Sequence, residues 1–66
     1  MMPTLTVLHD AHAVLDIIRF DALEPGPQPL TIARVMREAL LDKNSVLDAI
    51  TYLVETGRIS KEQVAQ

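Results

Sequence analysis

The chain has 66 residues, of which 48% are hydrophobic, and a formal net charge of −3 at pH 7, so we expect a single domain that spans 1–66. A domain of this size buries only about 60% of its unfolded surface, and the apolar content therefore predicts a homodimer or another protein partner. The absence of cysteine excludes disulfides and thiolate metal sites, and the absence of a secretory signal or of an apolar run of roughly 20 residues predicts no membrane contact and a cytoplasmic location.

The first eight residues are predicted to contain a short strand, because Thr4, Leu5, Thr6 and Val7 favour extended backbone. In the alternative interpretation this segment is a frayed terminus.

A helix is predicted from Ala11 to about Leu23, with Asp10 as its N-cap. Apolar residues recur on one side of this helix at helical spacing. They are Val14, Leu15, Ile18 and Ala22, flanked by Ile17 and Leu23. The charged residues of its other side are expected to be solvated, namely Asp16, Arg19 and Asp21. Prolines between Glu24 and Pro29 then end the helix and form a stiff loop, because each one removes a backbone donor.

Two further helices joined by a tight turn are predicted between Thr31 and Ile59. Thr31 and Asp42 are the expected N-caps, since their side-chain oxygens can accept hydrogen bonds from free amides of the first turn. Apolar residues follow each cap at helical spacing. They are Ile32, Val35, Met36 and Ala39 in the first helix and Val46, Ala49, Ile50 and Leu53 in the second. Gly57 suits a left-handed position just after the second helix.

This stretch carries a recognisable pattern, which consists of Thr31, Val35, Met36, Ala39, Leu41, Asp42, Val46, Ala49, Ile50, Leu53, Gly57 and Ile59. On these residues, less than half of the chain, it resembles the winged-helix branch of the helix-turn-helix superfamily. The resemblance implies a mostly α-helical, three-helix fold with at most a short two-stranded β element. Met36 stands where the family usually has a small residue, and Leu40 where its turn usually has glycine. Leu40 therefore predicts a turn without a left-handed residue at that position, or a slightly longer second helix.

The last residues are too few for a complete wing. Ser60 and Gln63 have the spacing of a capping box and could begin a final helix. A wing needs a hairpin of about ten residues after Ile59, and only seven follow it. The wing is therefore expected to be absent or vestigial.

In this superfamily the second helix of the motif enters the major groove of DNA. The resemblance thus implies a small transcriptional regulator that binds double-stranded DNA as a homodimer, with residues 43–52 in the groove. The candidate DNA contacts are Arg34, Arg37, Lys43, Asn44, Ser45, Thr51, Tyr52, Arg58 and Lys61. Leu47 and Asp48 are unusual on such a helix, because one is a large apolar group on a wet face and the other would lie near phosphates.

The alternative is a non-catalytic protein-interaction module of the same fold that does not bind DNA. Residues 1–30 carry four carboxylates and one arginine, and residues 31–66 carry five cations and five carboxylates, whereas DNA-binding domains of this size are usually basic. The candidate interface residues are Phe20, Leu40, Leu47 and Tyr52. Phe20 either faces a second subunit in this way or anchors the core. A continuous positive stripe around residues 43–52 would favour DNA, and a dry apolar patch there would favour a protein partner.

His9, His12 and Asp16 are the only candidates for a metal site, and they lack a fourth ligand. An ion pair between His12 and Asp16 across one helical turn is the preferred interpretation, so no metal site is predicted. Glycine-rich phosphate loops and nucleophile elbows are absent, and Ser45 and Ser60 have no evident His–Asp partners. The chain is therefore predicted to have no cofactor and no catalytic activity.

Overall fold

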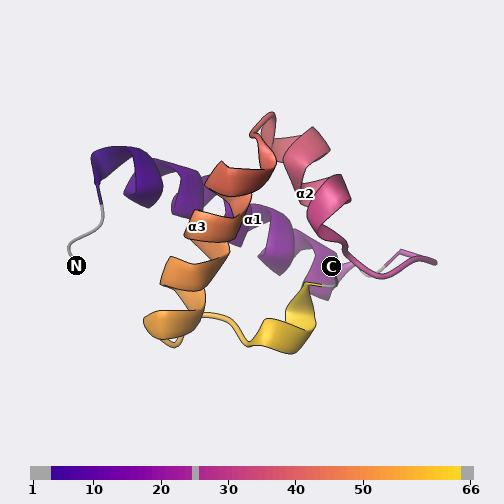
Figure 1. The fold of residues 1–66 in the computed structure, drawn as a ribbon. Coiled ribbons are helices and arrows are strands. Elements are labelled where there is room, and N and C mark those ends of the chain that lie inside the picture. The colour runs from indigo at the N-terminus through magenta and orange to yellow at the C-terminus, as the bar shows by residue number, and fades with distance from the viewer. Residues whose placement is uncertain (1–3, 25, 65–66) are drawn as a thin grey trace.

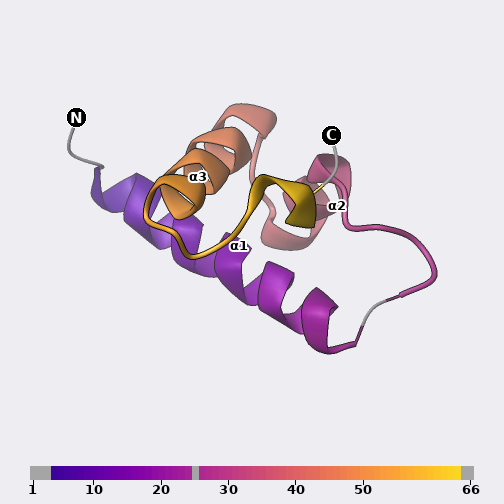
Figure 2. The same cartoon turned by 90° about the horizontal axis from the view of Figure 1, so that it is seen from below.

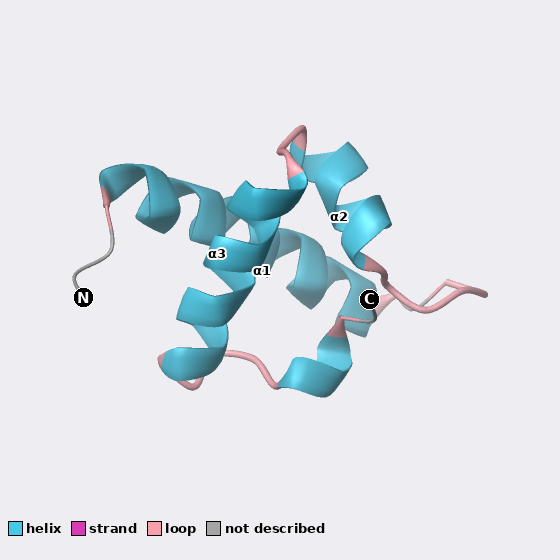
Figure 3. Cartoon of the chain, viewed as in Figure 1, coloured by secondary structure: helices cyan, strands magenta, loops and turns pink. Residues whose placement is uncertain are grey.

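The structure, a computed structural model, describes residues 4–24 and 26–64, and in this part of the chain every regular element is a helix (Figure 3). The elements are α1 (Leu5–Leu23), α2 (Ile32–Ala39), α3 (Lys43–Glu55) and a short 3-10 helix, η1 (Lys61–Gln63). In Figure 1, α3 crosses in front of α1 and α2 lies beside both. The predicted mostly α-helical fold with three helices is therefore confirmed.

The prediction of a strand at Thr4 to Val7 was wrong, because α1 already begins at Leu5 and residues 4–8 contain no strand. Thr4 is its N-cap, and the Thr4 Oγ1 accepts a hydrogen bond of 3.2 Å from the Val7 N–H. Strand propensity over four residues is a weak preference, whereas a capped helix satisfies the backbone of the whole segment. Asp10 consequently lies inside α1 and is buried, instead of capping it.

The predicted apolar face of α1 is confirmed in the middle of the helix, but the prediction was wrong at its C-terminal end. Val14, Leu15 and Ile18 are buried, and α1 packs mainly against α3 through this face. Ala22 and Leu23 are exposed, since α1 runs past the end of the core at this point. After a projecting loop at residues 26–29, Leu30 brings the chain back into the core (Figure 2).

The caps of α2 and α3 are those expected. Thr31 Oγ1 accepts a hydrogen bond of 3.2 Å from the Arg34 N–H, and Asp42 Oδ1 accepts one of 2.8 Å from the Ser45 N–H. The facing sides of the helices supply the centre of the core. Its most deeply buried large side chains are Leu53, Val14, Val35 and Val46.

The turn between α2 and α3 differs from the prediction at Leu40. This residue has φ 57° and ψ 43°, which is the left-handed conformation that we did not expect there. The Met36 carbonyl accepts hydrogen bonds from both the Leu40 and the Leu41 N–H groups, so the turn needs the reversed backbone twist to satisfy the end of α2. Leu40 therefore occupies the conformation that glycine usually supplies.

The C-terminal end of α3 follows the prediction. Gly57 has φ +75°, and the N–H groups of Gly57 and Arg58 donate to the carbonyls of Val54 and Leu53 in a Schellman arrangement. The Ser60 N–H then donates to Gln63 Oε1 over 2.9 Å, which is half of the predicted capping box. The described residues after Ile59 thus form a 3-10 turn and no strand of a wing.

Candidate functional site

The outward side of α3 has no positive stripe. Asn44, Asp48, Thr51 and Glu55 recur at helical spacing on this side, and all four are exposed. Two of them are carboxylates and none is a cation. A helix with this surface would bring negative charge close to the phosphates if it entered the major groove.

Arg34 is a predicted phosphate contact whose charge is already paired within the molecule. Its Nη1 lies 3.0 Å from Asp21 Oδ1 on α1, and its Nε lies 2.6 Å from Glu38 Oε2 on α2. The hydrogen bond to Glu38, and then the one to Asp21, raise the pKa of the guanidinium. Asp21 was expected to be solvated, but its side chain is only 19% exposed because it packs against Arg34.

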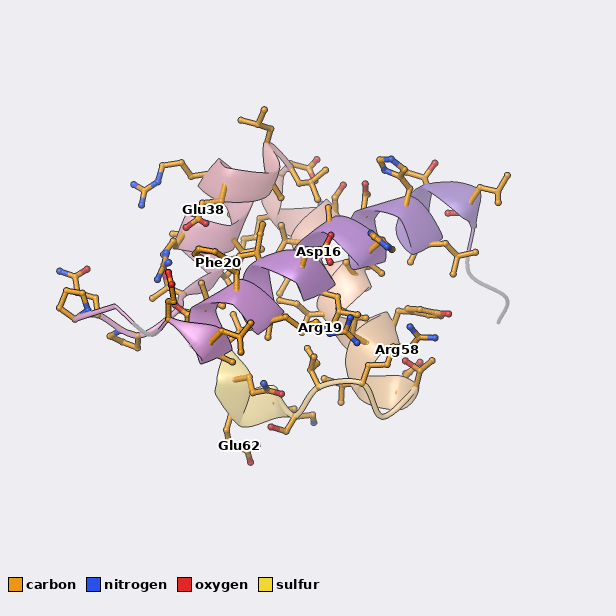
Figure 4. The ribbon with its side chains drawn as sticks, turned by 180° about the vertical axis from the view of Figure 1, so that it is seen from behind. Asp16, Arg19, Phe20, Glu38, Arg58 and Glu62 are labelled. Atoms are coloured by element: carbon orange, nitrogen blue, oxygen red, sulfur yellow. The ribbon has the colours of Figure 1, made fainter. Side chains whose placement is uncertain are left out.

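The remaining predicted cations lie on separate segments. Arg37 is exposed on α2 beside the loop at residues 26–28. Lys43 begins α3, Arg58 lies in the loop after it, and Lys61 begins η1. Figure 4, which views the molecule from the side opposite to Figure 1, shows Arg58 in that loop. These four residues do not form a continuous basic band along α3.

An apolar groove runs beside α3 instead. Its larger hollow, of about 510 Å³, is bounded by α3, by the start of α2 and by η1, which lies between the two helices in Figure 2. A second hollow of about 370 Å³ continues it toward the start of α3. We call the two hollows the α3 groove, since Ile32 and Leu47 line both of them. The lining residues are Ile32, Ala33, Met36, Lys43, Leu47, Ile50, Thr51, Val54, Glu55, Lys61 and Val64.

Of the predicted DNA contacts, Lys43, Thr51 and Lys61 line this groove, Thr51 from the edge that the groove shares with the outward side of α3. Asn44 is exposed on the outward side of α3, and Ser45 and Tyr52 are half-buried. The Ser45 hydroxyl and backbone N–H donate to Asp42 and lower the pKa of that carboxyl. The structure therefore divides the predicted contact set between a groove, an outward stripe and internal pairs.

Of the four predicted interface residues, only Leu47 lines the groove. Phe20 is 63% exposed on the side of α1 seen in Figure 4, and so does not anchor the core. Leu40 is exposed in the turn between α2 and α3, and Tyr52 is half-buried. Ile50 and Val54 were missed as surface residues. The sequence did contain a signal for them, because the apolar side of α3 is wider than packing against α1 requires.

The histidines on α1 form pairs and no cluster. His12 Nδ1 lies 3.5 Å from Asp16 Oδ2, which confirms the predicted pair across one turn. His9 Nδ1 lies 3.9 Å from Asp10 Oδ1. Among residues 4–24 and 26–64, no three histidine, aspartate or glutamate side chains gather as metal ligands would.

Known proteins give no evidence about the function of this chain, so its function is inferred from the geometry described above. The chain matches no family model, no curated protein and no solved structure. In the described residues, none of the helices combines the length and apolar character that crossing a membrane requires.

Proposed function

We propose that this chain is a non-catalytic protein-interaction module built on a helix-turn-helix of winged-helix type, with the α3 groove as its contact surface. The observation that carries the proposal is the apolar floor of Leu47, Ile50 and Val54 beside an α3 surface that has no cationic stripe. Apolar side chains at the centre of a contact, with charges at its rim, are typical of protein interfaces. Lys43, Glu55 and Lys61 supply such a rim.

DNA binding is the second candidate, and one feature favours it. The three-residue turn with a left-handed residue, followed by an α3 whose first turn exposes Lys43 and Asn44, suits a recognition helix. A regulator of this kind would bind an operator as a homodimer, and its affinity would fall steeply as salt increases. Against it stand the paired Arg34 and the outward Asp48 and Glu55.

A parallel selection tests the two candidates. Random peptides of about 12 residues, the length of helix that spans α3, and random duplex DNA are each panned on the immobilised chain at low salt. We expect peptides to be enriched, and their amide chemical-shift perturbations to centre on Ile32, Leu47 and Val54. The variant Leu47→Asp should lose this binding.

The control variant is Leu40→Asp, which makes the same chemical change at an exposed position outside the groove. It should bind the selected peptides like the original chain. Two results together would favour DNA binding over protein interaction. Duplex DNA would be enriched through Lys43 and Asn44, and every selected peptide would bind Leu47→Asp as well as it binds the original chain.

A further inference from the structure

The stripe of α3 that lines the groove begins with a lysine and continues with apolar residues. Its members recur at helical spacing and are Lys43, Leu47, Ile50 and Val54. At 3.6 residues per turn these positions lie within an arc of about 60° around the helix. The three apolar side chains are half-buried against the core, and Lys43 is exposed at the start of the stripe.

A second lysine lies across the groove, on η1. Lys61 lines the larger hollow and Lys43 the smaller one, so the two cations lie toward different ends of the apolar floor. Both lysines are exposed, and neither takes part in an ion pair between described residues. The stem of a lysine packs on apolar surface while its ammonium group stays in water. Each ammonium is therefore held at the rim of the groove by hydration and not by a carboxylate.

The nearby carboxylates do not neutralise this floor. Among the described residues Glu55 is the only carboxylate that lines the groove, and it lies about 120° from Lys43 around α3, on the outward side. Asp42 caps α3, and Glu62 points away from the molecule in Figure 4. No acidic residue of the segment 1–30 lines either hollow. The floor is therefore positive at its ends, although the chain has a net charge of −3.

A partner that covers the apolar floor also covers the two ammonium groups. Apolar side chains seated on Leu47 and Val54 displace water from the rim, and a charge that loses water without gaining a partner costs free energy. A carboxylate beside each ammonium removes this cost, a neutral side chain leaves it, and a cation adds repulsion to it. The groove therefore favours an acidic partner and rejects a basic one.

The shape of the partner follows from the shape of the floor. The floor runs along α3 from Lys43 to Val54, and a helix with apolar residues three and four positions apart matches such a straight groove. Phosphate groups could also meet the two lysines. A phosphate backbone, however, has no apolar side chains to cover the floor between them.

We infer that the α3 groove binds an acidic amphipathic helix of a partner protein, whose apolar side chains cover the floor and whose carboxylates meet Lys43 and Lys61. The inference rests on the proposed function and names the chemistry of its partner.

Three synthetic peptides of about 12 residues test this chemistry. They share the same apolar residues at helical spacing, and the residues that flank these at both ends are glutamate, glutamine or lysine. Fluorescence anisotropy at low salt gives their dissociation constants. The glutamate peptide should bind about tenfold more tightly than the glutamine peptide, because it forms two ion pairs at the rim. The lysine peptide should bind most weakly.

Charge reversal in the groove should invert this order. Lys43→Glu and Lys61→Glu should each weaken binding of the glutamate peptide about tenfold, and the double variant should prefer the lysine peptide. Each change places a carboxylate in the first turn of a helix, which suits the helix dipole, so circular dichroism should show an unchanged fold. The matched control is Arg19→Glu, which changes the net charge equally on α1, outside the groove, and should leave the three constants unchanged.

Several results would overturn the inference. Glutamate and glutamine peptides of equal affinity would do so, and so would a lysine peptide that binds most tightly. Equal effects of Lys43→Glu and Arg19→Glu would show that only net charge matters. A glutamate peptide that still binds after its apolar residues are replaced by serine would show attraction between charges without docking.

The peptides from the random selection separate this inference from the proposed function. If the three designed peptides fail while selected peptides bind through Leu47, only the acidic chemistry of the partner is wrong. If the selected peptides fail as well, the proposed function fails with it.

Discussion

Leu40 combines an unfavourable backbone conformation with a side chain that gains little from packing. A left-handed conformation costs a residue with a Cβ about 1–2 kcal/mol. The Leu40 side chain is 89% exposed, so burial does not offset that cost. The conformation persists because the end of α2 requires it, since the Met36 carbonyl accepts from both N–H groups of the turn.

Replacing Leu40 with glycine should therefore stabilise the domain. The variant Leu40→Gly removes the backbone cost and increases the entropy of the unfolded chain, which leaves a net gain of about 0.5–1 kcal/mol. The free energy of unfolding from urea titration measures it. Leu40→Ala is the control, because alanine keeps a Cβ and should give no such gain. A glycine variant less stable than the original chain would contradict this reading of the turn.

Arg34 was predicted to contact phosphates, but its charge is already paired within the molecule. It contacts Asp21 on α1 and Glu38 on its own helix, and so it ties α2 to α1 across the projecting loop. The pairing with Glu38 follows from four-residue spacing along a helix. The pairing with Asp21 depends on how two helices pack, which the spacing along the chain does not specify.

At the scale of the elements, the N-cap of α3 should make stability depend on pH. Hydrogen bonds from Ser45 lower the pKa of the Asp42 carboxyl below its ordinary value of 3.8. A carboxyl with a lowered folded-state pKa stabilises the fold above the ordinary value, and this contribution disappears as pH falls through the lowered one.

The variant Asp42→Asn keeps a side-chain oxygen at the cap and has no charge to titrate. The original chain should be the more stable of the two near neutral pH, and the difference should shrink as pH falls below 3.8. Urea titrations of both proteins across this range provide the comparison. A difference that stays constant with pH would show that the Asp42 charge has no part in the cap.

The elements were predictable from sequence where local chemistry decides them. Thr31, Asp42 and Gly57 occupy the positions expected, because a cap or a left-handed glycine depends on a few neighbouring residues. The segment before Asp10 was mistaken for a strand, because a short run of β-formers cannot reveal that Thr4 caps a longer helix. Leu40 was misjudged because the hydrogen bonds that end α2, and not residue preference, set its backbone conformation.

The candidate site was less predictable than the fold. The α3 groove is assembled from α2, α3 and η1, and only their relative placement brings Ile32, Leu47 and Val64 to one surface. Leu47 was recognised because it is apolar on a side expected to be wet. Val64 gave no local sign, since its role depends on where the chain returns after Gly57.

At the scale of the whole molecule, the homodimer expected from the apolar composition predicts a melting temperature that rises with protein concentration. Association stabilises the folded state by mass action, whereas the melting temperature of a monomer is independent of concentration. Scanning calorimetry over micromolar to millimolar concentrations should show the rise for the original chain. A melting temperature that is constant for the original chain would argue for a folded monomer.

The order of the helices along the chain also affects how the protein is made. α1 is synthesised first, yet the residues that cover its apolar face, such as Val46 and Leu53, come about thirty residues after its end. At a usual rate of about 5–20 residues per second, a ribosome needs roughly 2–6 s to add those residues. The domain can therefore complete its core only after α3 has been made and has left the ribosome.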